Sequence, residues 1–179
     1  MPFGFAEPGR QINRVHSPLL ARAVPWMTVA LASIAQTVPA IAAAPIMPPL
    51  GFMILLAWRQ LHPGLLPVWA GLPLGLIDDL YSGQPMGSAM FLWSVAMITL
   101  DLVEQRFPWR SYLLDWAVAS GFIGVYLVLS GVLAAPPQSL PLLQVLGPQL
   151  ILSILLFPLS ERFIALCDRL RLARFRSIA

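Results

Sequence analysis

Charge is scarce in this sequence, and lysine is absent from it altogether. Eleven arginines and eight acidic residues make 11% of the 179 residues charged, whereas a soluble domain carries about 25%. So few charges cannot cover a surface that faces water, which excludes a soluble globular domain. The hydrophobic fraction of 58% also excludes intrinsic disorder, which requires low hydrophobicity. A polytopic membrane protein of one domain remains.

Cysteine and histidine are nearly absent as well. Cys167 is the single cysteine, so an internal disulfide framework is excluded. His16 and His62 are the only two histidines, and they leave no cluster for a transition-metal site or a haem. We therefore expect a protein without a metal or other cofactor.

Long runs without any charge predict membrane-spanning helices. Runs of 36, 18, 21 and 45 uncharged residues separate Arg22 from Arg59, Arg59 from Asp78, Asp79 from Asp101, and Asp115 from Glu161. A helix needs about 20 residues to cross the hydrocarbon core, so the four runs hold about two, one, one and two crossings. The predicted fold is an all-α bundle of six transmembrane helices.

Proline and glycine divide these runs, because proline ends helices and glycine supplies turn geometry. The expected helices cover about 23–44, 48–59, 64–80, 87–104, 112–133 and 140–161. The second is short, and a re-entrant segment is the alternative there. A re-entrant segment would reverse the orientation of everything that follows it.

The positions of the arginines favour six crossings. If the N-terminus is cytoplasmic, six crossings place all eleven arginines in the cytoplasm, as the positive-inside rule requires, whereas five would divide them between the two sides. We therefore expect both termini inside. The expected organisation is a cytoplasmic tail over 1–22, a transmembrane domain over 23–165 and a basic cytoplasmic tail over 166–179.

Asp78 and Asp79 are the ionisable residues expected deepest on the outer side, where a charge is costly. Neighbouring helix positions differ by about 100°, so the two carboxylates cannot share a face. One interpretation is a helix end followed by the turn at Ser82 and Gly83. A second is a buried aspartate that accepts hydrogen bonds from the turn backbone, and a third is a metal or proton site.

A second acidic group is expected at the cytoplasmic end of the fourth helix. Asp101 and Glu104 are three residues apart and share a helix face. Arg106, Arg110 and Asp115 follow them closely. Ion pairing at the interface is the leading interpretation, and a docking surface for a cytoplasmic partner is the alternative.

The C-terminal tail alternates arginine with leucine and phenylalanine. Its arginines are Arg169, Arg171, Arg174 and Arg176. Arginines beside a transmembrane helix bind anionic lipid headgroups at about 1 kcal/mol each. We expect membrane anchoring here, with an acidic protein partner as the alternative, and we expect no nucleic acid.

Polar and small side chains within the helices are expected to join helices. Most of the polar ones should form hydrogen bonds between helices: Gln36, Thr37, Ser94, Thr99, Ser120, Ser130, Gln144, Gln149 and Ser153. Gly121 and Gly124 offer a small face for close packing. Most tryptophans lie near predicted helix ends, as in the aromatic belts of membrane proteins.

The sequence lacks the groups that enzymatic chemistry would require. A magnesium-dependent lipid-phosphate transferase needs several carboxylates on one side, and only Asp78 and Asp79 lie deep on the outer side. A serine hydrolase needs a base beside its serine, but both histidines fall in the cytoplasm on this topology. We expect a protein that is not an enzyme.

Residues 74–87 carry the most specific motif. They read Leu-Gly-Leu-Ile-Asp-Asp-Leu-Tyr-Ser-Gly-Gln-Pro-Met-Gly, which resembles the signature of the MreD family of bacterial rod-shape-determining membrane proteins. The positions that match are Gly75, Leu76, Asp79, Leu80, Ser82, Gly83 and Gly87. Asp78 occupies a variable position of the pattern.

The resemblance implies a scaffold subunit of the cell-elongation machinery, which controls peptidoglycan synthesis at the bacterial inner membrane. Its partner would be an MreC-like bitopic protein, and through it the MreB filament and the RodA–penicillin-binding-protein synthase pair. Gly75, Asp78, Asp79, Ser82, Gly83 and Gly87 would form a structural or partner-binding motif. The family is also similar in layout to the substrate-binding subunits of energy-coupling-factor transporters, so a small-molecule-binding subunit is the alternative.

Overall fold

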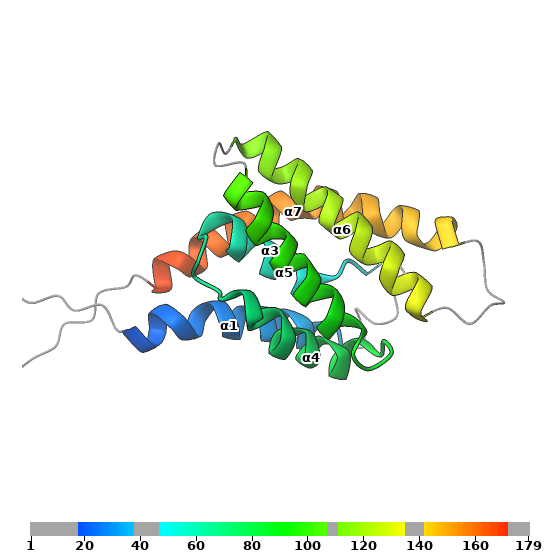
Figure 1. The fold of residues 1–179 in the computed structure, drawn as a ribbon, viewed down its shortest axis with the longest axis horizontal. Helices are drawn as coiled ribbons and strands as arrows, with labels where there is room; N and C mark the ends of the chain where they lie inside the picture. The colour runs from blue at the N-terminus through cyan, green and yellow to red at the C-terminus, as the bar shows by residue number, and fades with distance from the viewer. Residues whose placement is uncertain (1–17, 38–46, 107–110, 135–141, 172–179) are drawn as a thin grey trace, which may run out of the picture.

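The computed structural model describes residues 18–37, 47–106, 111–134 and 142–171, and every regular element in these residues is helical (Figure 1). This confirms the predicted all-α class. The elements are α1 (Pro18–Ala35), α3 (Leu50–Leu61), the 3-10 helix η1 (Val68–Ala70), α4 (Gly71–Ser82), α5 (Ser88–Arg106), α6 (Tyr112–Ala134) and α7 (Leu142–Arg171).

Three helix boundaries differ from those predicted. Helix α1 ends at Ala35, well before the predicted residue 44. The helix predicted over 64–80 begins only with η1 and α4, because Pro63 and Pro67 hold the preceding chain out of the α conformation. Helix α7 continues to Arg171, past the predicted helix end at 161, because its charged residues Arg162 and Asp168 do not interrupt a helix.

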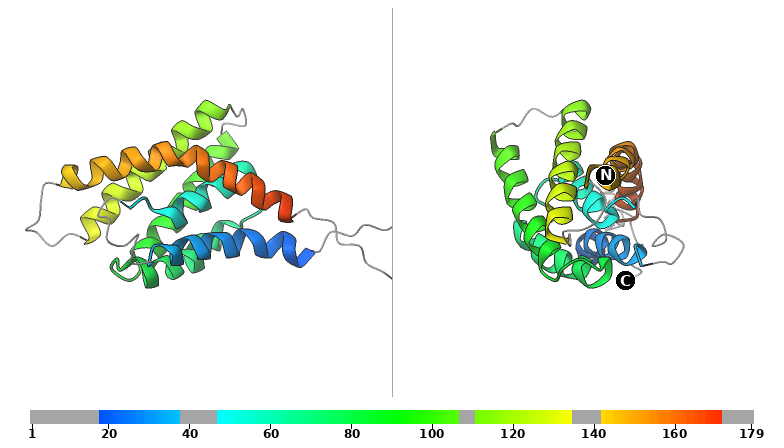
Figure 2. Two further views of the ribbon diagram at one scale, coloured as in Figure 1. Left: turned by 180° about the vertical axis from the view of Figure 1, so that it is seen from behind. Right: turned by 90° about the vertical axis from the view of Figure 1, so that its right-hand side faces the viewer.

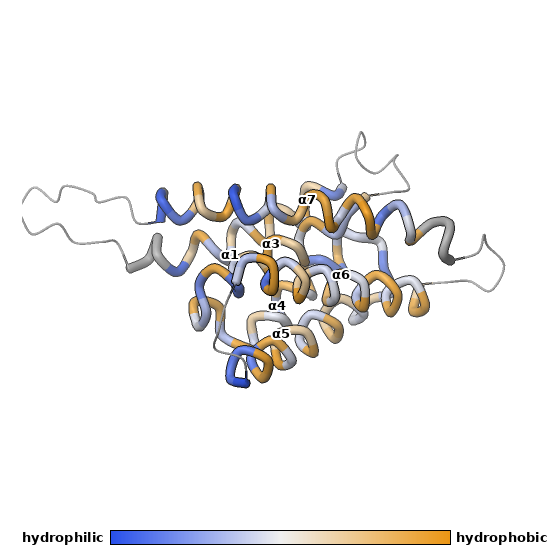
Figure 3. Tube along the Cα trace, turned by 90° about the horizontal axis from the view of Figure 1, so that it is seen from above, coloured by the Kyte–Doolittle hydropathy of each residue, from blue (hydrophilic) through white to orange (hydrophobic). Residues whose placement is uncertain are grey.

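Within the described residues, two helices are long and apolar enough to cross a membrane. They are Tyr112–Ala134, which is α6, and Leu146–Arg169, which is most of α7. Helix α3 has 12 residues and is therefore only about 18 Å long at 1.5 Å per residue, against a hydrocarbon core of about 30 Å. Helices α5, α6 and α7 expose many large apolar side chains, and Figure 3 shows hydrophobic residues along all three.

Helix α3 lies at the centre of the bundle, where it packs against α1, α6 and α7 (Figure 2). Ten of its 12 residues are buried, so it is enclosed on all sides, as a helix with apolar residues around its whole circumference should be. Phe52 stacks on Tyr126 with ring centroids 4.4 Å apart. Trp58 and Trp93 are completely buried, so the expectation of an interfacial position is wrong for these two tryptophans.

Helices α4 and α5 form the most closely packed pair, and two glycines of α4 allow the contact. A Cβ atom on Gly75 would lie 2.6 Å from the Cα atom of Met90, and one on Gly71 would lie 2.8 Å from the carbonyl oxygen of Trp93. Both obstacles are backbone atoms, which cannot move without displacing α5. The face of α4 toward α5 therefore requires glycine.

Gly75→Ala is expected to lower stability by about 1–3 kcal/mol, the usual cost of overpacking a close contact. The measurement is the midpoint of thermal unfolding of the purified protein in detergent. Gly121→Ala is the matched control, since no atom lies within 4 Å of its Cβ position, and its midpoint should not fall. Equal midpoints for Gly75→Ala and the wild type would contradict the close α4–α5 contact.

Gly121 also corrects a prediction, because no close packing occurs there. It lines an apolar groove of about 410 Å³ between α5 and α6, with Phe52 of α3 at its base. Gly124 meets only the side chain of Leu150, at 3.7 Å from a Cβ position. The small face predicted over these glycines is therefore largely open in this chain.

Four of the hydroxyl groups predicted to join helices bond within their own helix instead. Ser94, Ser120 and Ser153 donate to the carbonyl four residues earlier in their own helix, at 2.6, 2.8 and 2.6 Å, and Thr99 does the same at 2.7 Å. A short hydroxyl side chain reaches its own i−4 carbonyl and needs no partner on another helix. Longer side chains make the bonds between elements, as Gln36 does to Asp78 at 3.2 Å.

Candidate functional site

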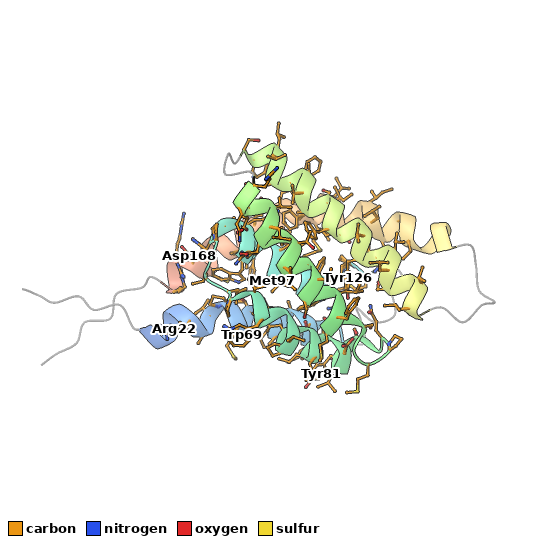
Figure 4. The ribbon with its side chains drawn as sticks, in the orientation of Figure 1. Arg22, Trp69, Tyr81, Met97, Tyr126 and Asp168 are labelled. Atoms are coloured by element: carbon orange, nitrogen blue, oxygen red, sulfur yellow. The ribbon has the colours of Figure 1, made fainter. Side chains whose placement is uncertain are left out.

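The turn between α4 and α5 is built on two left-handed glycines. Gly83 ends α4 with φ at +70°, and Gly87 precedes α5 with φ at +94°. A side chain is strained in this region of backbone space, whereas glycine enters it freely. We refer to residues 82–88 as the α4–α5 turn. It lies beside Tyr81 at one end of the bundle (Figure 4).

Asp79 caps α5 from the end of α4. Its carboxylate accepts backbone N–H groups of Gly87 and Ala89, both at 2.8 Å, and of Met90 at 3.1 Å, and it accepts the Ser88 hydroxyl at 3.2 Å. The first N–H groups of a helix have no partner within that helix, and a negative charge is favourable at this end of the helix dipole. Asp79 thus fixes the two helices to each other through the turn.

Asp78 faces a different part of the bundle, as the rotation between neighbouring helix positions requires. It is 2% exposed and accepts Gln36 Nε2 of the segment after α1 at 3.2 Å. Ser33 of α1 and Tyr126 of α6 also face this carboxylate. Asp78 therefore joins α1, α4 and α6 in the bundle interior.

A small polar pocket lies next to Asp78. It has a volume of about 170 Å³, and its polar lining is Gln36, Gln84, Tyr126, Ser130 and Gln149. No group of three or more histidine, cysteine, aspartate or glutamate side chains that could hold a metal ion occurs in the described ranges. Amide and hydroxyl oxygens are thus the groups that this pocket offers to a ligand.

The opposite end of the bundle holds the arginines. Helix α1 begins there, and α3, α5 and α7 end there (Figure 1). The described arginines are Arg22, Arg59, Arg106, Arg162, Arg169 and Arg171, and we refer to this end as the arginine end.

Arg59 is the centre of the arginine end. It is 3% exposed, forms ion pairs with Asp101 and with Glu104 (3.0 Å to the latter), and donates to the carbonyl of Leu66 at 3.2 Å. The predicted pairing of the two acidic residues therefore occurs, but their partner comes from α3 and not from the neighbouring Arg106. The sequence did not indicate Arg59 as the partner, because it lies 42 residues from Asp101. The feature that could have indicated it is that Arg59 is the one charged residue in an otherwise apolar helix.

A second ion-pair group connects α3 to the end of α7. His62 Nε2 lies 3.1 Å from Asp168 Oδ1, and Arg171 pairs with the same oxygen at 2.8 Å. Arg171 thus binds within the fold, while Arg169 is exposed. Arg174 and Arg176, predicted with them as a lipid-binding surface, lie outside the described residues.

The described fold is all helical, and two of its helices are long and apolar enough to cross a membrane, as in a helical membrane protein. The family model described as rod shape-determining protein MreD matches residues 19–166. The chain belongs to the MreD family, which confirms the resemblance carried by residues 74–87. No curated protein and no solved structure gives a significant match.

Proposed function

We propose that this chain is a non-enzymatic scaffold subunit of the bacterial cell-elongation complex. Family membership over residues 19–166 is the observation that carries the proposal. The use of its charged side chains supports it, since Asp79 caps a helix and Arg59 neutralises two carboxylates inside the fold. Asp79 and Arg59 thus both hold helices in place. This suits a protein that presents a fixed surface to its partners.

The proposed arrangement in the inner membrane has six crossings with both termini in the cytoplasm. Arg22 lies near the start of α1, and Arg59, Arg106, Arg169 and Arg171 lie near the ends of α3, α5 and α7. These helix ends lie at one end of the bundle, as the positive-inside rule requires of the cytoplasmic side. The α4–α5 turn would then face the periplasm. The exposed apolar faces of α5, α6 and α7 would contact lipid or a partner helix.

Cysteine labelling tests this orientation along a single helix. The background is Cys167→Ser, which removes the only cysteine. Met86→Cys and Gln105→Cys each then place a single thiol at one end of α5. Met86 is 72% exposed, and Gln105 is also exposed. We expect a membrane-impermeant maleimide to label Met86→Cys in intact spheroplasts and Gln105→Cys only after permeabilisation. The reverse pattern would contradict the proposed orientation.

The proposed partner is an MreC-like bitopic membrane protein, with the MreB filament and the RodA–penicillin-binding-protein pair reached indirectly. Tagged full-length chain, purified from membranes of its own host, should retain the MreC-like protein, and untagged membranes should not. If the partner is present in those membranes and the tagged chain retains none of it, the proposed partnership is wrong.

One observation favours the alternative of a small-molecule-binding transport subunit, namely the polar pocket beside Asp78. Its volume of about 170 Å³ is well below the roughly 300–1,000 Å³ of pockets that enclose a whole small ligand. The scaffold therefore remains the better-supported function. A vitamin-sized molecule retained by the purified protein in mass spectrometry would reverse this order.

A further inference from the structure

The polar pocket has no role in the proposed scaffold function, and its chemistry points to a ligand. It opens beside the α4–α5 turn, and its polar side chains come from the segment after α1, the turn itself, α6 and α7. Figure 4 shows Tyr126, one of its lining residues, on α6 toward the end of the bundle that carries Tyr81. We propose that this pocket binds a primary ammonium group, presented by an ethanolamine lipid headgroup or by a small soluble amine.

Three of the polar side chains that line the pocket donate their hydrogen bonds to acceptors of the protein itself. Gln36 donates through Nε2 to Asp78 at 3.2 Å, and Gln149 donates through Nε2 to the carbonyl of Met47. Ser130 donates to a carbonyl of its own helix at 3.2 Å. Each of these side chains keeps an oxygen that can accept a further hydrogen bond. A ligand with several N–H donors matches such a lining.

The acidic side chains near this pocket favour a cation over an anion as its ligand. Asp78, 2% exposed, lies directly behind Gln36 and Tyr126, which both face its carboxylate and both line the pocket. The neighbouring Asp79 already accepts four hydrogen bonds at the start of α5. Among the described residues, the groups that act on Asp78 are Ser33, Gln36, Asp79 and Tyr126, and none of them is basic.

The size of the pocket restricts the ligand to a small head. A volume of about 170 Å³ admits an ammonium group with a short stem, while the rest of a lipid stays outside. A primary ammonium carries three N–H donors, as lysine does, whereas the quaternary ammonium of choline has the same charge and no donor. The pocket should therefore prefer ethanolamine to choline.

The first experiment compares ethanolamine with choline at equal concentration and ionic strength. The readout is the midpoint of thermal unfolding of the full chain in detergent, which rises when a ligand binds the folded state. We expect ethanolamine to raise the midpoint. Choline should bind at least about tenfold more weakly, because its ammonium group cannot make the hydrogen bonds that ethanolamine makes. Equal effects of the two amines, or no effect of ethanolamine, would overturn the proposal.

Two variants separate binding from folding. Asp78→Asn keeps the size of the side chain and removes its charge, and Ser130→Leu fills the pocket while leaving Asp78 in place. Both should lose the response to ethanolamine. Thr99→Val on α5, which lines the apolar groove and not this pocket, should keep it. A full response in a folded Ser130→Leu protein would place binding elsewhere and overturn the proposal.

Native mass spectrometry distinguishes the two sources of the amine. The chain is released from nanodiscs that contain ethanolamine and glycerol phospholipids in equal amounts. Selective retention of the ethanolamine lipid by the wild type, and its loss in Ser130→Leu, would assign the ligand to the membrane. Retention of neither lipid, together with binding of soluble ethanolamine, would assign it to a soluble amine.

Discussion

Replacing Asp79 by leucine is expected to destabilise the protein by about 3 kcal/mol or more, since each buried donor left without a partner costs about 1–3 kcal/mol. Three backbone N–H groups at the start of α5, and the Ser88 hydroxyl, would lose their acceptor. Water cannot replace it, because the site is 5% exposed. The measurement is the unfolding midpoint in detergent, with the amount of folded protein in the membrane beside it.

Neighbouring variants make this prediction specific. Asp79→Asn retains one acceptor oxygen and should lose less than Asp79→Leu. Asp78→Leu should also lose less, because Asp78 faces the side chains of Gln36, Ser33 and Tyr126, which can rotate toward other partners, and it caps no helix. If Asp78→Leu and Asp79→Leu are equally stable, the account of the α4–α5 turn is wrong.

Replacing Arg59 by alanine is expected to cost about 3–5 kcal/mol, the range for removing one partner of a buried ion pair. Arg59 is 3% exposed and pairs with both Asp101 and Glu104, so its loss removes a counter-charge from both carboxylates. The stability of Arg59→Lys should fall between those of Arg59→Ala and the wild type. A single ammonium keeps the charge but cannot reproduce the contacts of the guanidinium with two carboxylates and the Leu66 carbonyl. The same unfolding measurement applies.

Two controls separate this effect from a general loss of positive charge. Arg106→Ala removes an exposed arginine from the same end and should cause no measurable loss. Combining Arg59→Leu with Asp101→Asn and Glu104→Gln should recover part of the stability, because the uncompensated charges are gone. A stability of Arg59→Ala equal to that of Arg106→Ala would refute a structural role for the ion pairs.

The bounds of α6 could be read from the sequence, whereas the central position of α3 and the shortness of α4 could not. Helix α6 runs over Tyr112–Ala134, almost as predicted, because an unbroken apolar run bounded by charge and proline has one interpretation. The burial of α3 was not predictable, since an apolar helix inside a bundle and one against lipid have the same composition. The shortness of α4 follows from Pro67 and from the η1 turn before it.

Contacts within a motif were accessible to sequence reasoning, and contacts between distant helices were not. Asp79 and its donors lie 8 to 11 residues apart, so a buried aspartate accepting bonds from the turn was one of the interpretations left open. Asp78 and Gln36 lie 42 residues apart, as do Arg59 and Asp101. Pairs at this separation depend on which helices become neighbours, and the sequence pattern does not determine that.

The motif of residues 74–87 now has a physical explanation at most of its positions. Gly75 permits the α4–α5 contact, Asp79 caps α5, and Gly83 and Gly87 adopt positive φ. Three matching positions have no such explanation: the Ser82 hydroxyl makes no hydrogen bond within the described part of the chain, and Leu76 and Leu80 are exposed.

The most direct test of the central claim is cell shape after depletion of this protein in its own host. The ratio of cell length to width should fall toward that of a sphere as the protein is lost. Re-expression of the wild type should restore rods, and Asp79→Leu should fail to restore them because the α4–α5 turn does not form. Normal rods after complete depletion would contradict the proposal that this protein supports cell elongation.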